Sequence, residues 1–370
     1  MPYPQFDRHK VKMLPLAARR SKIEIERDHI PVDSPPKGLS PAAMKTIDAA
    51  VEKIVAARRA DTPVMLSFGA HTIKNGLAPV LIALMEEGWV THLATNGAGI
   101  IHDWEFAFQG KSSEDVQVYV RQGQFGNWEE TGFNINLALN VGAYAGRGYG
   151  EAVGSFIEAE GLEIPEIPAL QEEIVEHAAD APQRSAAAAD LLSIIKTFDL
   201  SSGRMDVPHP WKRYSVQAAA FRFGVPLTGH PMFGHDIIYN HAMNHGASLG
   251  RAAERDFLTF AESVRRLEGG VYLSIGSAVM SPMVFEKSLS ISQNLAIQRG
   301  TLIENHSIFV VDLAQSNWDW SQGEPPVDKP DYYLRYNKSF NRMGGQMHYL
   351  TADNRDFLLA VYQSLQGRTV

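Results

Sequence analysis

The sequence predicts an α/β protein with a doubly wound, mostly parallel Rossmann-like sheet of about six strands and helices on both faces. Three observations predict this fold class. Short apolar runs alternate with stretches of helical spacing, and most of these runs end in Gly, Ser, Thr, Asn or Asp. The 370 residues, 45% hydrophobic and 21% charged, are also enough to bury a large core.

The elements are expected in a simple order along the chain. Residues 1–39, rich in proline and charge, are predicted to form an N-terminal arm that docks on a neighbouring subunit. Ser40 as N-cap and Pro41 at the first helical position then predict a helix to about Arg59. Residues 40–370 are expected to form a single domain with a helical insertion at about 131–210. The predicted strands are TPVMLSFG, THLATNG, VPLTGHP, VYLSIGS, IFVVDLA and QMHYLTA.

The carboxyl ends of these strands are where a ligand is expected, because doubly wound sheets bind ligands at that edge. Small residues there allow backbone N–H groups to approach a phosphate closely. The residues that close the strands are Gly69, Thr95 to Gly97, Gly229, Gly276, Ser277, Thr351 and Asp353.

Charge and composition narrow the classes of partner. A formal net charge of −8 argues against nucleic acid and anionic membranes and is compatible with a small cationic amine. The chain has no cysteine, which excludes disulfides and thiolate metal sites. No apolar leader and no uncharged segment of membrane-spanning length is present, so we expect a cytoplasmic protein.

Two glycine-containing segments resemble phosphate loops. GRGYGEAVG (146–154) follows helix-like sequence, where the dinucleotide fingerprint requires a strand. TNGAGIIHDWEF (95–106) does follow a predicted strand, which favours Asn96, Gly97 and Gly99 as the cofactor loop. His102 and Asp103 end this loop, where a histidine of the core or surface and a helix cap are the plain alternatives.

The densest histidine run, GHPMFGHDIIYNHAMNHG, predicts no metal site. Its His241 and His245 have no acid between them, and no second ligand motif lies nearby. Asp236 in the same run is a carboxylate that could hold a cationic amine, or alternatively the N-cap of the next helix.

Lys338 lies in PDYYLRYNKSF, among four aromatic residues. Aromatic walls desolvate an amine and favour the neutral nucleophile that attacks an imine carbon. The alternative is a lysine that rests on tyrosine rings with its ammonium in water. No GxSxG motif and no diagnostic carboxylate pair points to a hydrolase instead.

The order of seven segments resembles the deoxyhypusine synthase family. These segments are LSFGAHTIKNG, VTHLATNGAGIIHD, GVPLTGHPMFGHDIIYNH, YLSIGSAV, VVDLAQSNWDWSQG, PDYYLRYNKSF and YLTADNRDFLL. The resemblance implies a Rossmann-like NAD-binding domain and transfer of an aminoalkyl group through an imine on a lysine. Tyr336, Asn337 and Lys338 fall where the family has Trp-Gly-Lys, which implies that Lys338 forms the imine.

The same resemblance implies roles for further residues. It assigns His102, Asp103 and Asp236 to catalysis beside Lys338, with Asp236 holding the substrate amine. The implied substrate residues are Tyr332, Tyr336, Asp319, Gln322 and His241. The implied NAD residues are Thr95, Asn96, Gly97, Gly276, Ser277, Ala314, Gln315, Ser321 and Asp353.

Several positions depart from the family pattern. His102, Tyr332 and Gln322 each stand where the family has a carboxylate, and Ser281-Pro282 replaces an expected Lys-His pair. A buried ammonium that lacks a carboxylate is costly, so a site with fewer acids should not suit a triply charged polyamine. We therefore expect a different amine substrate.

The sequence supports three functional hypotheses. The first is an NAD-dependent transferase that moves an aminoalkyl group from a polyamine or related amine to an acceptor amine, for which a protein lysine is one candidate, in a homo-oligomer that family analogy makes a tetramer. The second is an NAD-dependent amino-acid or amine deaminase or cyclase, because TNGAGIIHDWE also resembles the loop of ornithine-cyclising domains. The third is a non-catalytic NAD-binding protein.

Overall fold

The computed structural model describes residues 3–369, apart from the side chain of Ser321. The chain divides into two compact units. Unit 1 runs to Arg27 and adds Ile100–Phe221 and Pro231–Asp256, whereas unit 2 consists of Asp28–Gly99, Arg222–His230 and the chain from Phe257 on. The division follows the path of the chain, which leaves the sheet after its second strand and again after its third. The arm, the single domain and the helical insertion at about 131–210 stay predictions.

Unit 2 is built on a parallel sheet of six strands, which confirms the predicted fold class. The strands are β2 (Val64–Phe68), β3 (His92–Asn96), β7 (Leu227–His230), β8 (Val271–Ile275), β9 (Ser307–Asp312) and β10 (Gln346–Thr351). Their order across the sheet is β10-β9-β8-β2-β3-β7, and every neighbouring pair is parallel. All six coincide with predicted strands.

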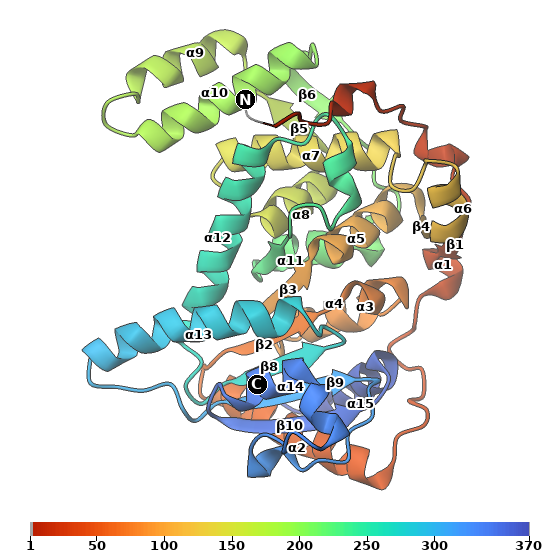
Figure 1. Ribbon diagram of the computed structural model, residues 1–370, viewed down its shortest axis with the longest axis vertical. Helices are drawn as coiled ribbons and strands as arrows, with labels where there is room; N and C mark the ends of the chain where they lie inside the picture. The colour runs from red at the N-terminus through yellow and green to blue at the C-terminus, as the bar shows by residue number, and fades with distance from the viewer. Residues whose placement is uncertain (1–2, 370) are drawn as a thin grey trace. The chain divides into compact units, whose positions relative to one another are not determined.

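Helices cover both faces of this sheet. Figure 1 shows α13 on one side and α2 on the other. The helices that lie wholly in unit 2 are α2 (Pro41–Arg59), α3 (Ala70–Lys74), α4 (Ala78–Glu86), α13 (Met280–Gln298), α14 (Arg335–Asn341) and α15 (Asn354–Leu365). Two short 3-10 helices, Trp320–Gln322 and Pro330–Tyr333, precede α14.

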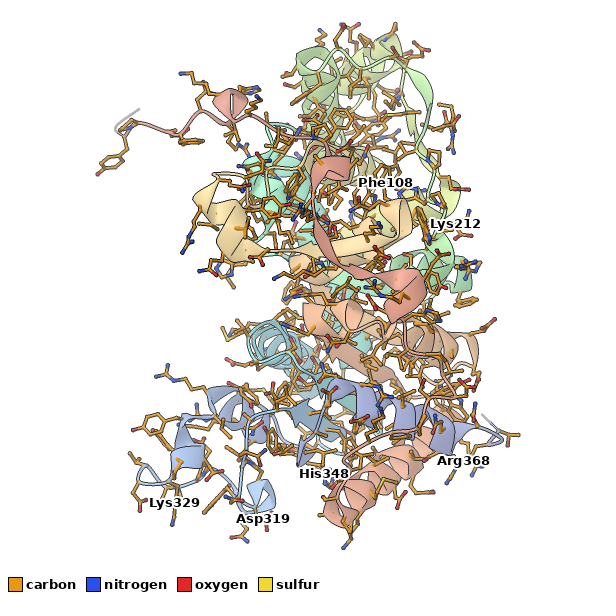
Figure 2. The ribbon with its side chains drawn as sticks, turned by 90° about the vertical axis from the view of Figure 1, so that its right-hand side faces the viewer. Phe108, Lys212, Asp319, Lys329, His348 and Arg368 are labelled. Atoms are coloured by element: carbon orange, nitrogen blue, oxygen red, sulfur yellow. The ribbon has the colours of Figure 1, made fainter. Side chains whose placement is uncertain are left out.

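Alternate residues of each strand enter two separate cores. On the α13 face, the Tyr272 ring stacks on Phe285 with 4.2 Å between ring centroids. On the α2 face, Phe309 and His348 stack at 4.7 Å, and Figure 2 labels His348. Because both faces are covered, β2 and β8 read as continuous buried runs rather than as alternating ones.

The predicted first helix is confirmed in detail. Ser40 accepts a hydrogen bond from the N–H of Ala43 at 3.1 Å, and Pro41 opens the helix. The preceding segment lies along α15, where Gln363 donates to the carbonyls of Val32 and Ser34 at 2.9 and 2.8 Å.

Unit 1 is mainly helical. Its strands form two antiparallel pairs, β1 (Ser21–Glu24) with β4 (Lys111–Glu114) and β5 (Gly161–Ile164) with β6 (Gly203–Asp206). Its helices are α6 (Val116–Arg121), α7 (Glu129–Tyr144), α8 (Tyr149–Ala159), α9 (Ile167–Glu176) and α10 (Pro182–Thr197). Its 3-10 helices are Arg8–Lys10, Leu16–Ala18, Lys212–Tyr214 and Ile237–Asn240. The helices α1 (Ile25–Asp28), α5 (Gly97–Gln109), α11 (Val216–Phe223) and α12 (Gly246–Arg265) cross the boundaries between the units. None of the helices in the described range is long and apolar enough to span a bilayer.

The N-terminal segment packs against its own chain within unit 1. The N–H of Leu14 donates to the carbonyl of Asn127 at 3.1 Å, and the N–H of Glu129 returns a bond to Leu14 at 2.9 Å. The N–H of Leu16 donates to the Glu130 carboxylate at 2.6 Å. Docking of this segment on another subunit stays a prediction.

A buried ion pair joins this segment to α5. Arg19 and Glu105 form two parallel hydrogen bonds of 2.7 Å, and each side chain is 1% exposed. Thr131 and Ser112 also donate to the Glu105 carboxylate, at 3.0 and 2.5 Å. Burial alone would raise the pKa of Glu105, but the Arg19 guanidinium and the hydrogen bonds lower it.

We predict that Arg19→Ala strongly destabilises unit 1, because it leaves the Glu105 carboxylate buried without its cation. The free energy of unfolding, measured by chemical denaturation, should fall by about 3–5 kcal/mol. Arg20→Ala is the matched control, since Arg20 is exposed and should change the stability by less than about 0.5 kcal/mol. Equal effects of the two substitutions would contradict this role of the ion pair.

Candidate functional site

The strand order of unit 2 places a topological switch point between β2 and β8. Numbered along the chain, the strands lie in the order 3-2-1-4-5-6, which is that of dinucleotide-binding sheets. The connections that leave β2 and β8 run in opposite directions along the sheet. The carboxyl edge between these two strands is therefore the candidate site.

Two glycines bring the backbones together at this point. A Cβ on Gly69 would lie 2.1 Å from the carbonyl oxygen of Gly276. Gly276 itself has φ +56°, and a Cβ there would meet the Asn354 amide at 2.4 Å. Both positions thus require glycine. The N–H groups of Gly69 and Gly276 continue the sheet by donating to Ile275 and Val311.

Below the switch point, buried hydroxyls link β2, β8 and α13. The Tyr272 hydroxyl donates to Ser67 at 2.7 Å and shares a 2.8 Å hydrogen bond with Ser281. The Ser281 hydroxyl also lies 2.8 Å from the Ser274 hydroxyl, and the N–H of Ser281 donates to the Ser277 hydroxyl at 3.2 Å. This network holds the turn between β8 and α13. The sequence analysis did not predict this hydroxyl network. The one signal at this position was that Ser281-Pro282 replaces the Lys-His pair of the family pattern.

Side chains of the turn between β3 and α5 form hydrogen bonds that stabilise the turn. Thr95 donates to the Phe68 carbonyl at 2.9 Å, and the Asn96 side chain accepts from the N–H of Gly99 at 2.9 Å. A Cβ on Gly99 would lie 2.1 Å from the Thr95 hydroxyl. Gly97 opens the helix, and one N–H of its first turn, that of Gly99, is already used by Asn96.

Two of the remaining candidates for cofactor binding, Ala314 and Asp353, form hydrogen bonds within the fold. The N–H of Ala314 donates to Asp312 at 3.1 Å, and its carbonyl accepts from Tyr349 at 2.5 Å. The Asp353 side chain caps α15 by accepting from the N–H of Arg355 at 2.8 Å. Gln315 is exposed in the loop that follows β9. Their roles in cofactor binding stay predictions.

Asp319 and Gln322 lie in the loop between β9 and α14, and Figure 2 shows Asp319 there together with Lys329. The Gln322 amide donates to the Asp319 carboxylate at 2.9 Å. The side chain of Ser321, a predicted cofactor residue, lies outside the described part of the chain.

Lys338 rests against an aromatic ring and a carboxylate. Its ammonium lies 3.4 Å from the centroid of Tyr332 and 3.6 Å from Glu324, and the side chain is 13% exposed. Glu324 is also paired with Arg342 at 2.9 Å. Both contacts of Lys338 stabilise a charged ammonium. They fit the alternative of a lysine that rests on tyrosine rings better than a neutral nucleophile. Tyr336 belongs to another group, since its hydroxyl lies 3.3 Å from that of Tyr349.

In unit 1, Asp103 is an anchor for α11. Its carboxylate accepts from the Ser215 hydroxyl at 2.6 Å, from the N–H groups of Val216 and Gln217 at 2.8 and 3.2 Å, and from the Gln217 amide at 2.9 Å. Burial raises the pKa of Asp103, and these four bonds oppose the rise. His102, one residue earlier, bonds to Ser112 at 2.7 Å. The catalytic roles of both residues stay predictions, and the Asp103 oxygens are already occupied.

Asp236 is a carboxylate with weak partners. Its side chain accepts a long hydrogen bond from the Tyr239 hydroxyl, at 3.4 Å. Burial raises the pKa of Asp236 to about 6, although the Tyr239 hydroxyl, the nearby His235 and a main-chain hydrogen bond with Met232 each lower it. The nearby Tyr149 hydroxyl is fully buried and has no hydrogen-bond partner among the described residues. Asp236 is thus a carboxyl group that a cation would stabilise in its charged form.

His241 has a fixed hydrogen-bonding role. Its Nδ1 accepts from the N–H of Met243 at 3.0 Å, so Nε2 carries the proton and faces Glu129 at 3.5 Å. Burial lowers the pKa of His241, against the effect of Glu129. Within the described residues, no group of three or more His, Cys, Asp or Glu residues could hold a metal ion.

In the GRGYGEAVG segment, a carboxylate of the same chain lies where a phosphate loop would bind a phosphate. The Asp256 carboxylate accepts from the N–H of Gly150 at 2.9 Å at the start of α8, and a Cβ on Gly148 would lie 1.8 Å from it. The glycines therefore admit a carboxylate of the same chain where a phosphate loop would admit a phosphate.

His92 and His230 share one hydroxyl in unit 2. The Thr228 hydroxyl lies 3.0 Å from a ring nitrogen of each, and His92 also bonds to Ser263 at 2.8 Å. The Phe260 ring packs edge-on against both. Burial lowers the pKa of each histidine to about 3. Both are therefore neutral at physiological pH.

No family model and no curated protein matches the chain. Among solved structures, it is similar to apo ArgZ, described as an arginine dihydrolase of the ornithine–ammonia cycle in Cyanobacteria, with 14% identity and a TM-score of 0.40 over 88% of this chain and 33% of that one. The structure described as the ternary complex of AgrE with ornithine and NAD+ is 13% identical to this chain, with a TM-score of 0.40. The match covers 87% of this chain and 33% of AgrE. A conserved LOR/SDH protein from Methanococcus maripaludis S2 is 12% identical to this chain, with a TM-score of 0.41. The match covers 90% of this chain and 73% of that one. The chain thus spans about a third of ArgZ and AgrE, and the likeness concerns the fold alone.

The predicted resemblance to deoxyhypusine synthase was wrong, and so was the prediction of an aminoalkyl transferase. The structures that the chain resembles are ArgZ, AgrE and a LOR/SDH protein. Most of the segments that carried the resemblance are strands and strand ends of a doubly wound sheet, so their order reports the fold, and a fold does not fix a function. The polyamine donor, the protein lysine acceptor and the imine on Lys338 depended on that resemblance and lose its support.

The pH dependence of stability should reveal the neutral histidine pair. Because the folded pKa of His92 lies below its usual value near 6.5, the unfolded chain binds the proton first as the pH falls. The free energy of unfolding should therefore decrease below about pH 6.5, by on the order of a few kcal/mol towards pH 3. His92→Gln should flatten this decrease, whereas His71→Gln, at an exposed position, should not. A decrease of the same slope in His92→Gln would contradict the assignment.

Proposed function

We propose that this chain is an NAD-dependent enzyme that oxidises an amino acid or a related amine and releases its nitrogen as ammonia. The observation that carries the proposal is the strand order of unit 2, with a switch point where the backbones of β2 and β8 meet at two glycines. In this reaction, the carbon beside the nitrogen loses a hydride and the nitrogen loses a proton. Water then adds to the resulting imine, and ammonia leaves.

The residues at the switch point fit a dinucleotide. Gly69 and Gly276 allow the ends of β2 and β8 to meet as bare backbone at the point where the two turns diverge. After Gly276 the chain turns into the long helix α13, which begins at Met280, and the first-turn N–H groups of a helix attract phosphate oxygens. Ser277 and the hydroxyl network of Tyr272 hold the second of these turns. NAD, when bound, would supply the hydride acceptor.

In unit 1, Asp236 is the group that we propose to hold the amine of the substrate. Burial raises its pKa more than Tyr239, His235 and the main chain of Met232 together lower it, and a bound ammonium would favour the charged carboxylate. Asp103 is a poorer candidate, since its oxygens already accept four hydrogen bonds.

Binding of NAD is the first test. Wild-type protein titrated with NAD in a calorimeter should bind it, and Gly69→Ala should weaken binding strongly because its Cβ meets the carbonyl oxygen of Gly276. The strain should also cost about 1–3 kcal/mol of stability. Gly250→Ala is the matched control, because no atom lies within 4 Å of a Cβ there. Absence of NAD binding by the wild type would overturn the proposed function.

Turnover is the second test. With NAD and a panel of amino acids and diamines, the reduction of NAD, followed by absorbance, should be accompanied by an equal amount of ammonia. Because the pKa of Asp236 is about 6, turnover should rise as the pH increases through that value and the carboxylate becomes charged. Asp236→Asn should lower the rate and remove this rise. Tight NAD binding without turnover on any member of the panel would favour the non-catalytic hypothesis instead.

A further inference from the structure

The outer side of α13 in unit 2 carries a group of exposed apolar side chains. Ile291 and Leu295 are each 44% exposed, and Met283 is 51% exposed. Leu258, on the end of α12 that lies beside α13, is 54% exposed. Single exposed apolar residues are common, but a group of them on adjoining helices marks an interaction surface. These four side chains and the two grooves beside α13 are called the α13 face.

A groove lies on each side of α13. The first, of about 480 Å³, lies between α13 and the end of α12, where the Ser292 hydroxyl donates to the Ala261 carbonyl at 3.1 Å. The second, of about 500 Å³, lies between α13 and the segments around Ile303 and Met343. Ser290 lines both grooves and is exposed, so it lies on the crest between them. The helix α13 is thus a ridge with a groove along each side.

The charges that line the two grooves balance. Glu262 and Arg265 line the first groove and form a salt bridge of 2.6 Å. The charged residues of the second groove are Glu286, Lys287, Glu304 and Arg342. Because the whole chain has a net charge of −8, two copies repel each other in general, and a neutral face minimises that repulsion. The same balance disfavours an anionic membrane or a nucleic acid, which bind basic surfaces.

We propose that the α13 face is the contact between two copies of this chain, related by a two-fold axis. Such a contact uses the same surface twice, so the surface must fit itself. In this pair, α13 of each copy lies in the groove between α12 and α13 of the other. Ile291 and Leu295, four residues apart, form the kind of ridge that packs into the groove of a second helix, and Leu258 covers that helix from the other side. The second groove keeps the crest of α13 clear of neighbouring segments, so that it can enter the partner.

The α13 face is large enough for a stable contact. With 19 residues, α13 is about 28 Å long. Packed helices lie about 8–10 Å apart, so α13 and one flanking element on each side form a strip roughly 25 Å wide. The strip covers roughly 700 Å², which is close to the ~800 Å² that each partner contributes to a stable interface.

The assembly state of the full chain in solution is the first test. By analytical ultracentrifugation, the wild type should sediment as a dimer or as an assembly of dimers. Ile291→Asp places one carboxylate from each copy in the apolar contact and should weaken the association about a hundredfold or more. Val175→Asp is the matched control, because Val175 is an apolar residue of α9 in unit 1 with 78% exposure. It should leave the assembly unchanged, and circular dichroism should show both variants to be folded.

Cysteine cross-linking tests the same contact independently of its strength. The natural chain has no cysteine, so each introduced thiol is unique. Lys287→Cys, Ile291→Cys and Asn294→Cys are each treated with a short bismaleimide. Because a two-fold axis brings part of α13 next to its own copy, at least one of these variants should form a covalent dimer. Val175→Cys should form none.

The results distinguish the α13 face from other modes of association. A tetramer that Ile291→Asp reduces to a smaller assembly would support the contact, as would a dimer that becomes a monomer. A monomer at every concentration, an assembly that withstands Ile291→Asp, or the absence of a cross-link at all three positions would each overturn it. None of these measurements requires NAD or an amine, so their outcome is separate from that of the proposed function.

Discussion

The close approach of Gly69 to the Gly276 carbonyl is the constraint on which unit 2 depends. A Cβ on Gly69 would lie 2.1 Å from that oxygen, so no side chain fits and the ends of β2 and β8 can meet only as bare backbone. This contact lies where the strand order reverses, at the part of the carboxyl edge from which the two turns diverge. The hydroxyl network of Tyr272, Ser67 and Ser281 then fixes the second turn from below.

Buried polar groups in both units serve the fold before they serve a ligand. Asp103 holds the start of α11, and Glu105 neutralises Arg19. Burying such groups is costly unless each is paired, so the local structure determines which acids remain for chemistry. Asp236 differs because its side-chain hydrogen bond to Tyr239 is long. A carboxyl group with incomplete pairing can gain from an added ammonium, whereas Asp103 would have to give up bonds to bind one.

The sheet could be predicted from the sequence, whereas the candidate site could be predicted only in part. Runs such as VMLSF are apolar on both sides, which identifies a covered parallel strand without any contact information. Thr95 and Asn96 were placed correctly at a strand end. Their side chains form hydrogen bonds that hold the turn, and the sequence could not predict this because short-range hydrogen bonds are not visible in composition or spacing. The family assignment failed for a related reason. Segment order follows from the fold, and many unrelated proteins share it.

The N-terminal segment shows what sequence patterns miss. Without periodicity it was interpreted as an arm for another subunit, yet Arg8 contacts Tyr239 and Asn244, more than two hundred residues away. Such contacts depend on the tertiary path of the chain, and one arginine in an irregular segment gives no signal of them. A charged group supplied by an otherwise irregular segment can be oriented by main-chain carbonyls, which do not neutralise it. The tertiary path of the chain, and no local pattern, therefore determines the orientation of Arg8.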